Sequence, residues 1–293
     1  EEWLQSQDQP SSVFYYATWL ALQGDEAHPV LGTDKTIQEI TRDDIIRFRS
    51  ANYTKANMLF VLAGDVADLT IEDVEAALAP YDVEEGVKNP PLDLPADLGT
   101  WDAPTSVNVS HVSTQAQVGL WLGGFDSEEL KEDDYAQKVF FNALGGGLHS
   151  LLFERIREEL GLAYSVSAHN NAGIGSDTVS LISSLTSPEN VPKMVEEIRT
   201  LLERVKQEGV SEDRLVSAHG NLLFRSASAM DSVGSVINDA ASNFFRHDGD
   251  IETSGIKRSY EILRNLDPKT IDCCRFMSKM LQRTAIAVLN GPE

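Results

Sequence analysis

The sequence is poor in the features that mark several classes of protein. It has only two cysteines, and because Cys273 and Cys274 are neighbours they cannot close the long loops of a disulfide scaffold. Its longest apolar runs, such as Met58 to Ala63, are far shorter than the roughly 20 residues that cross a bilayer. The first residues, Glu-Glu-Trp-Leu-Gln, are neither basic nor apolar enough for a signal peptide. We therefore expect neither a disulfide scaffold nor a membrane partner.

Basic residues are also scarce. The 293 residues contain 24 Lys and Arg against 46 Asp and Glu, a net charge of −22 that repels phosphate backbones and attracts cations. Nucleic acid is therefore not an expected partner, whereas basic peptides are compatible with this charge. A composition of 42% hydrophobic and 24% charged residues indicates a globular chain with a packed core.

Hydrophobic periodicity and turn residues predict an alternation of helices and strands. Helices are expected at 2–23, 42–52, 71–78, 133–144, 150–160, 189–207, 212–245 (one helix or a pair) and 268–281, and strands at 58–63, 106–112, 115–122, 162–168, 178–185 and 285–289. The run 115–122 alternates polar and apolar residues, as a half-buried strand does. Pairs of strands followed by paired helices predict the α+β class, with helices layered on a largely antiparallel sheet. Prolines among acidic residues at 85–104 predict an extended linker between residues 1–84 and 105–293.

Two short strings occur twice in the same order. Arg47–Ser50 (RFRS) is echoed by Arg275–Ser278 (RFMS), and Val61–Gly64 (VLAG) by Val288–Gly291 (VLNG). The two strings start 14 residues apart in the first copy and 13 in the second, so the same helix, turn and strand are expected to end both halves. Strings this short also match by chance. If the repeat is genuine, about 120 residues at the front of the first copy lie outside this chain.

Three consecutive glycines, Gly145, Gly146 and Gly147, separate two of the predicted helices. Without side chains, this turn lets another backbone approach closely. A phosphate-binding loop would need a Lys and a Ser or Thr after the glycines, and that pair is absent. Two interpretations follow: a tight corner between helices, or a loop that contacts a peptide substrate.

A second group of candidates surrounds Gly161, which stands where a left-handed helix cap is expected. Arg157 lies one turn before this glycine and Tyr164 lies three residues after it, so the reversal could bring a guanidinium and a phenol to the same rim. Two such donors suit a carbonyl oxygen that becomes an oxyanion. The alternative is structural: Arg157 balances the helix dipole, and Tyr164 is half-buried with its hydroxyl in water.

The run from Gly145 to Val166 resembles the C-terminal domain of the pitrilysin/insulinase family of zinc metallopeptidases, which includes processing-peptidase-like bacterial members. Residues 28–33, 45–53 and 57–65 are similar to the latter part of that family's N-terminal domain. The resemblance implies two homologous α+β domains that form a clamshell, the first incomplete here. On this basis residues 1–84 belong to the N-terminal peptidase domain, 85–104 are the linker and 105–293 are the C-terminal peptidase-like domain.

The resemblance also assigns roles to particular residues. Arg157 and Tyr164 match the family's pair that binds the substrate backbone near zinc and stabilises the tetrahedral intermediate. The opening Glu-Glu-Trp-Leu resembles the segment that supplies a glutamate zinc ligand, with Glu2 as the better match; alternatively, Glu2 is a solvated acid in a helix's first turn. The family's His-x-x-Glu-His motif is absent, so this chain alone is expected to be inactive and to bind no zinc.

Three hypotheses about function follow. The first is a fragment of a zinc-dependent endopeptidase that hydrolyses peptides in a clamshell chamber, to which this chain supplies the carbonyl-binding half of the site through Arg157 and Tyr164. The second is a non-catalytic partner subunit that shapes the chamber and binds peptide, and the third a generic peptide-binding protein in which both residues are structural. A peptide substrate and a second subunit, in a homodimer or a heterodimer, are the expected partners. The resemblance leaves the compartment open between bacterial periplasm and cytoplasm.

Overall fold

The computed structural model describes residues 1–23, 30–81, 83–89, 105–123, 127–171, 179–246 and 255–290. The chain divides into two compact units: the first comprises Glu1–Thr33, Leu94–Leu222 and Leu266–Glu293, and the second Asp34–Asp93 and Leu223–Asn265. Most of the predicted linker, 90–104, lies outside the described residues. The predicted domain boundaries stay a prediction, because units defined by contacts need not coincide with homologous domains.

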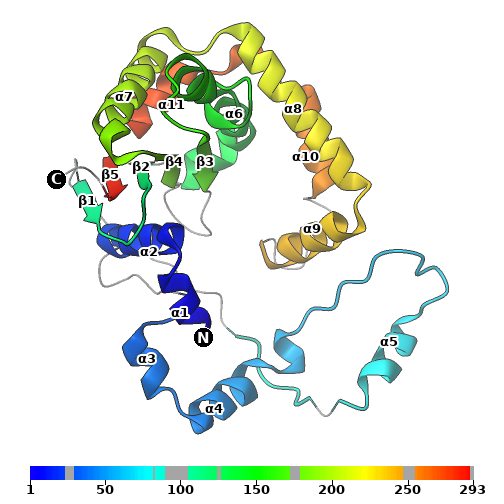
Figure 1. Ribbon diagram of the computed structural model, residues 1–293. Coiled ribbons are helices and arrows are strands. Elements are labelled where there is room, and N and C mark those ends of the chain that lie inside the picture. The colour runs from blue at the N-terminus through cyan, green and yellow to red at the C-terminus, as the bar shows by residue number, and fades with distance from the viewer. Residues whose placement is uncertain are drawn as a thin grey trace. The chain divides into compact units, whose positions relative to one another are not determined.

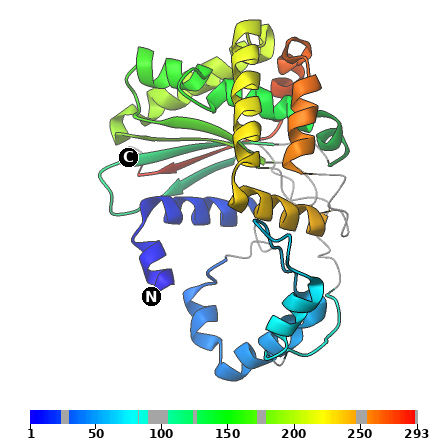
Figure 2. The same ribbon diagram turned by 90° about the vertical axis from the view of Figure 1, so that its right-hand side faces the viewer.

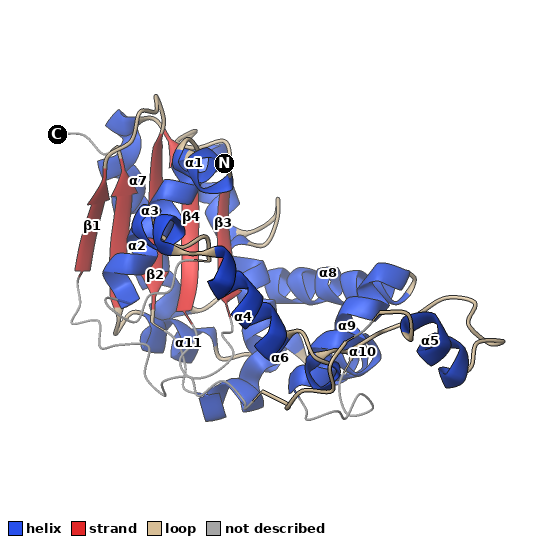
Figure 3. Ribbon diagram, turned by 90° about the horizontal axis from the view of Figure 1, so that it is seen from below, coloured by secondary structure: helices blue, strands red, loops and turns tan. Residues whose placement is uncertain are grey.

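A five-stranded sheet organises the first unit, with its strands in the order β1-β5-β2-β4-β3. The strands are β1 (Thr105–Val109), β2 (Ala116–Leu122), β3 (Val166–Asn171), β4 (Val179–Thr186) and β5 (Thr284–Leu289). Only β1 and β5 are parallel, and the other neighbouring pairs are antiparallel. Figure 3 shows these strands side by side. The predicted α+β class with a largely antiparallel sheet is confirmed.

Helices cover both faces of this sheet (Figures 1 and 2). The helix α2 (Pro10–Gln23), which follows the short α1 (Glu2–Gln7), lies against one face. The opposite face is covered by α6 (Ser127–Gly145), α7 (Val191–Glu208) and α11 (Cys273–Met280). A sheet covered on both sides needs strands that are buried on both sides.

The strand β2 shows this burial and corrects the sequence-based interpretation. All seven of its residues are buried, although the alternation of 115–122 predicted a half-buried strand. The alternation arises partly from Gly119, where a β-carbon would lie 2.7 Å from the ring of Phe14 in α2. Phe14 is fully buried and packs with Trp121, Leu181 and three residues of β5. The small residue therefore makes room for a core aromatic side chain and does not mark a solvated face.

Most predicted helices form, with changes where helix breakers or tertiary contacts act. The range 2–23 is interrupted before Pro10, whose ring cannot continue a helix. The range 212–245 is a pair, α8 (Glu212–Met230) and α9 (Val233–Arg246). Two helices, α3 (Asp34–Glu39) and α10 (Ile256–Asn265), were not expected. No helix among the described residues is both long and apolar enough to cross a membrane.

Two helices of the second unit, α4 (Arg42–Asn52) and α5 (Ile71–Leu78), begin and end at the residues predicted from the sequence. Each begins with a capping box, in which a threonine and the aspartate three residues later exchange hydrogen bonds. These bonds to Thr41 and Thr70 lower the pKa of Asp44 and of Asp73. The strand expected at 58–63 is wrong, since this segment pairs with no strand among the residues that the structure describes.

The two cysteines are free thiols with different environments. Burial raises the pKa of Cys273 from its ordinary 9.0 to about 11. Between these values the folded state keeps a proton that the unfolded state releases, so this thiol's contribution to stability falls as pH rises through that range. We expect iodoacetamide at pH 8 to modify half-buried Cys274 first and Cys273 only after denaturation, as peptide mass mapping would show. Equal labelling of both thiols in the folded protein would contradict this expectation.

Candidate functional site

The three glycines follow α6 and include one close approach between backbones. Gly145 is the last residue of α6, and a β-carbon there would lie 2.4 Å from the backbone nitrogen of Ala168 in β3. At Gly146 a β-carbon would collide with Asn142, whereas at Gly147 nothing lies within 4 Å. The close approach predicted for this turn therefore occurs within the first unit, between Gly145 and β3. The part of these glycines in substrate binding stays a prediction.

The helix after the glycines ends in a left-handed cap. Its last part is a π-helix, η3 (Phe153–Glu159), a local form that is often found at functional sites. Gly161 has a φ of 61°, which glycine adopts without steric cost. Its amide donates to the carbonyl of Arg157 (3.2 Å), and the amide of Leu162 donates to the carbonyl of Ile156 (2.9 Å). This cap reverses the chain and delays the start of β3 to Val166, four residues later than predicted.

Two side chains of β4 fix the reversed segment to the sheet. The Thr186 hydroxyl donates to the carbonyl of Leu162 (2.6 Å), and the Ser184 hydroxyl donates to the carbonyl of Ser165 (2.8 Å). Thr186 and Ser184 are both buried, so these bonds are shielded from water. Tyr164 lies between the two anchored carbonyls, and 81% of it is exposed. The backbone at this point is therefore held in place while the phenol reaches solvent.

Arg157 and Tyr164 are in contact. The Arg157 guanidinium lies 4.6 Å from the centre of the Tyr164 ring and 4.7 Å from the centre of the Phe153 ring. Phe153 is buried, so the cation contacts one ring of the core and one exposed ring. Within the described part of the chain, Arg157 makes no side-chain hydrogen bond or ion pair.

A neighbouring arginine on the same helix behaves differently. Arg155 donates from two of its nitrogens to one carboxylate oxygen of Glu197 in α7 (2.7 and 3.0 Å). A third nitrogen donates to Glu159 (2.7 Å), and these bonds raise the pKa of Arg155. Arg155 therefore fastens the helix to α7, a structural task that Arg157 does not share.

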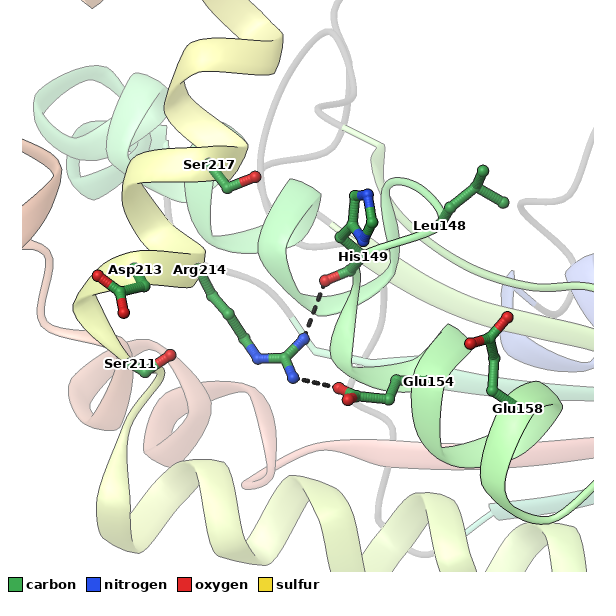
Figure 4. A pocket seen from close by; sticks show the side chains of 8 residues that line it. All are labelled: Leu148, His149, Glu154, Glu158, Ser211, Asp213, Arg214 and Ser217. Atoms are coloured by element: carbon green, nitrogen blue, oxygen red, sulfur yellow. Dashed lines mark hydrogen bonds and ion pairs between the residues drawn. The ribbon is translucent and has the colours of Figure 1, made fainter.

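A cavity of about 440 Å³ lies beside the glycine-rich turn (Figure 4). It is lined by residues of the turn, of the following helix and of the start of α8: Leu148, His149, Glu154, Glu158, Ser211, Asp213, Arg214 and Ser217. Arg214 donates to the carbonyl of His149 (2.9 Å) and forms an ion pair with Glu154, which joins α8 to the turn. Glu158 and Asp213 add further negative charge to the lining.

The candidate zinc ligand, Glu2, is not among the residues that line this cavity. Glu2 is an exposed residue in the first turn of α1. No three His, Cys, Asp or Glu side chains among the described residues are grouped so that they could hold a metal ion. His28 and His247 lie outside those residues, and Nε2 of His111 is 2.8 Å from the carbonyl oxygen of Gln7. The described residues thus do not fit a zinc ion by themselves, because a catalytic zinc needs about three protein ligands.

The sequence shows what kind of protein carries this fold. The family described as "Peptidase M16 inactive domain" matches residues 39–222, more than half of the chain. The chain therefore belongs to the M16 peptidase family, which agrees with the resemblance to pitrilysin-type peptidases.

Several known proteins are similar to this chain. An uncharacterized zinc protease of Streptomyces coelicolor is 29% identical over 245 residues, which cover 81% of this chain and 52% of that protein. An uncharacterized zinc protease of Rickettsia felis is 23% identical over 298 residues, covering 100% of this chain and 68% of the relative. A peptidase M16 inactive domain from Pseudomonas fluorescens shares the fold, with a TM-score of 0.78, 18% identity, and coverage of 100% of this chain and 68% of that one. The chain thus spans about half to two thirds of the length of these proteins.

Three contacts that shape this region were not expected from the sequence. The Phe153–Arg157 contact and the Arg155–Glu159 ion pair have a spacing of four residues, a recognisable helical signal. The ion pair between Arg214 and Glu154 joins residues 60 positions apart, and no local pattern indicates it.

Proposed function

We propose that this chain is a peptide-binding part of a zinc endopeptidase of the M16 family, in which Arg157 and Tyr164 bind a carbonyl oxygen of the bound peptide. The contact between a guanidinium without a carboxylate partner among the described residues and an exposed phenol carries this proposal. Both groups are hydrogen-bond donors, so a peptide carbonyl, which only accepts, is a matching ligand.

The contact with two rings supports a binding role. A guanidinium over aromatic rings gains cation–π energy, while the N–H groups in its plane stay available for hydrogen bonds. Phe153 and Tyr164 restrict Arg157 before the ligand arrives, which lowers the entropic cost of binding. The same donors would strengthen their bonds to an oxygen that gains negative charge during hydrolysis.

The proposal assigns the zinc ion mainly to residues other than those that the structure describes. Relatives of this chain carry the name zinc protease, and the described residues hold no group that fits the ion. Glu2 is the candidate zinc ligand among the described residues, and we place the other protein ligands of the zinc ion outside them. The zinc would supply the activated water, whereas Arg157 and Tyr164 orient the peptide.

Peptide binding by this chain tests the role of Arg157 and Tyr164. A fluorescein-labelled unfolded peptide rich in Lys and Arg suits the net charge of −22 and the acidic lining of the cavity. We expect Arg157→Ala to raise Kd roughly tenfold, because a hydrogen bond to a charged donor is worth about 1.5–3 kcal/mol. Tyr164→Phe keeps the ring and should raise Kd roughly threefold to fivefold. Fluorescence anisotropy measures both constants.

Arg199→Ala provides the matched control. Arg199 is exposed on α7, and its removal changes the net charge by the same unit. Arg157→Ala and Arg199→Ala with equal Kd values would show that only charge matters and would support the structural alternative. No measurable binding by the unaltered chain at millimolar concentration would contradict the proposal directly.

A further inference from the structure

Tyr164 breaks the burial pattern of the segment that leads into β3. Leu162 and Val166, two residues before it and two after it, are each 6% exposed, and Ala168 is 5% exposed. Side chains two residues apart point to the same face of a strand, so a strand over 162–168 would bury Tyr164 together with them. Tyr164 is exposed instead. The chain therefore departs from strand geometry at this residue.

The register of β3 with β4 shows which residue Tyr164 would meet in such a strand. Val166 lies opposite Ser184, and Ala168 lies opposite Ile182. Two further residues would place Tyr164 opposite Thr186, but the pairing stops at Val166. In an antiparallel pair the carbonyls of one strand accept hydrogen bonds from the backbone amides of the other. The carbonyls before Val166 therefore need other donors.

Two hydroxyls of β4 are those donors. The bonds from Thr186 to the carbonyl of Leu162 and from Ser184 to the carbonyl of Ser165 stand on either side of Tyr164. Both hydroxyls belong to the strand whose backbone would otherwise pair with this segment. A side-chain hydroxyl reaches farther from its strand than a backbone amide does, so the bound carbonyls do not adopt the spacing of a strand pair.

We propose that Thr186 and Ser184 are positioning residues of the peptide site. Their hydroxyls end β3 at Val166 and thereby hold the Tyr164 phenol outside the sheet, where it meets the Arg157 guanidinium. Both hydroxyls are buried and already donate to the backbone, so they act through Tyr164 and not on the ligand. The inference rests on the proposed function, because Arg157 and Tyr164 are the groups proposed to bind the peptide carbonyl.

Hydroxyl-radical footprinting, read by mass spectrometry, tests the position of the phenol in this chain without any peptide. Thr186→Val keeps the shape of the side chain and removes the donor, so the segment is free to extend the strand. We expect the oxidation rate of Tyr164 to fall at least about threefold, because a strand would turn this 81% exposed side chain to the covered face. Tyr53, which is also exposed, is the internal standard. Thr186→Ser retains a hydroxyl and should keep the rate of the unaltered chain.

Ser184→Ala and Ser180→Ala form a matched pair. Each removes a buried hydroxyl from the same face of β4, but Ser180 donates to the side chain of Asn170 (3.3 Å) and not to the backbone beside Tyr164. Ser184→Ala should therefore slow the oxidation of Tyr164, whereas Ser180→Ala should not. Equal effects of this pair would indicate a general change in the sheet and would overturn the proposal. Unchanged oxidation of Tyr164 in both Thr186→Val and Ser184→Ala would overturn it as well.

The peptide-binding assay shows whether the position of the phenol matters to the ligand. We expect Thr186→Val to raise Kd roughly threefold, as the loss of one hydrogen bond does, and to have no effect when Tyr164 is already replaced by Ala. An equal rise in both backgrounds would overturn the positioning role while the proposed function stands. If Arg157→Ala and Tyr164→Phe leave Kd unaltered, the proposed function itself fails, and footprinting alone decides whether the two hydroxyls hold the phenol.

Discussion

Replacing Phe276 by Ala is expected to lower the free energy of unfolding of the first unit by about 3–5 kcal/mol, as deletion of a fully buried aromatic ring does. Phe276 is 1% exposed, and its ring meets that of Phe140 in α6 edge to face, with centroids 5.8 Å apart. The substitution leaves a cavity where α11, α6 and α7 cover the sheet. Urea denaturation followed by near-UV and far-UV circular dichroism measures the loss.

Phe48→Ala is the matched control, because it removes the same side chain at the corresponding position of the other copy. Phe48 is 63% exposed, so we expect a change within about 0.5 kcal/mol. Equal losses for the two variants would mean that Phe48 is buried in solution. That result would contradict the different exposure of Phe48 and Phe276 in the structure. A loss below about 1 kcal/mol for Phe276→Ala would show that the packing over the sheet is loose.

Gly145→Ala is expected to destabilise the chain by about 1–3 kcal/mol, the usual cost of inserting a group into a packed site. In a helix Ala is otherwise favoured over Gly by about 1 kcal/mol, so the sign depends on the surroundings. Here the new β-carbon would lie 2.4 Å from the nitrogen and 2.6 Å from the β-carbon of Ala168. The backbone of β3 cannot move aside as a flexible side chain would. The collision therefore outweighs the gain in helix propensity.

Gly147→Ala separates packing from ligand contact in the same turn. A β-carbon at Gly147 meets nothing within 4 Å, and its φ is not positive, so stability should stay within about 0.5 kcal/mol of the unaltered chain. The peptide-binding assay on this variant then examines the expected substrate contact of the glycines. A raised Kd at unchanged stability would support that contact. A large loss of stability from Gly147→Ala, or none from Gly145→Ala, would refute the packing argument.

Short-range signals were sufficient for several elements. α4 and α5 have the predicted bounds, because each capping box depends on residues three positions apart. The glycine at position 161 predicted the reversal after the helix, because few other residues adopt a left-handed cap. The juxtaposition of Arg157 and Tyr164 follows from that reversal, although Phe153, which completes the contact, was not anticipated.

Periodicity and caps, which are local properties, determined the α+β class from the sequence by itself. The resemblance of the sequence to known peptidases indicated the M16 family and the residues that are candidates for binding a peptide carbonyl. The tertiary structure decided which apolar segments are buried. The run 115–122 became a strand covered on both faces because helices pack on both sides of it. The run 58–63 is wholly apolar, yet it pairs with no strand among the residues that the structure describes, and a strand forms only where a second strand accepts its hydrogen bonds.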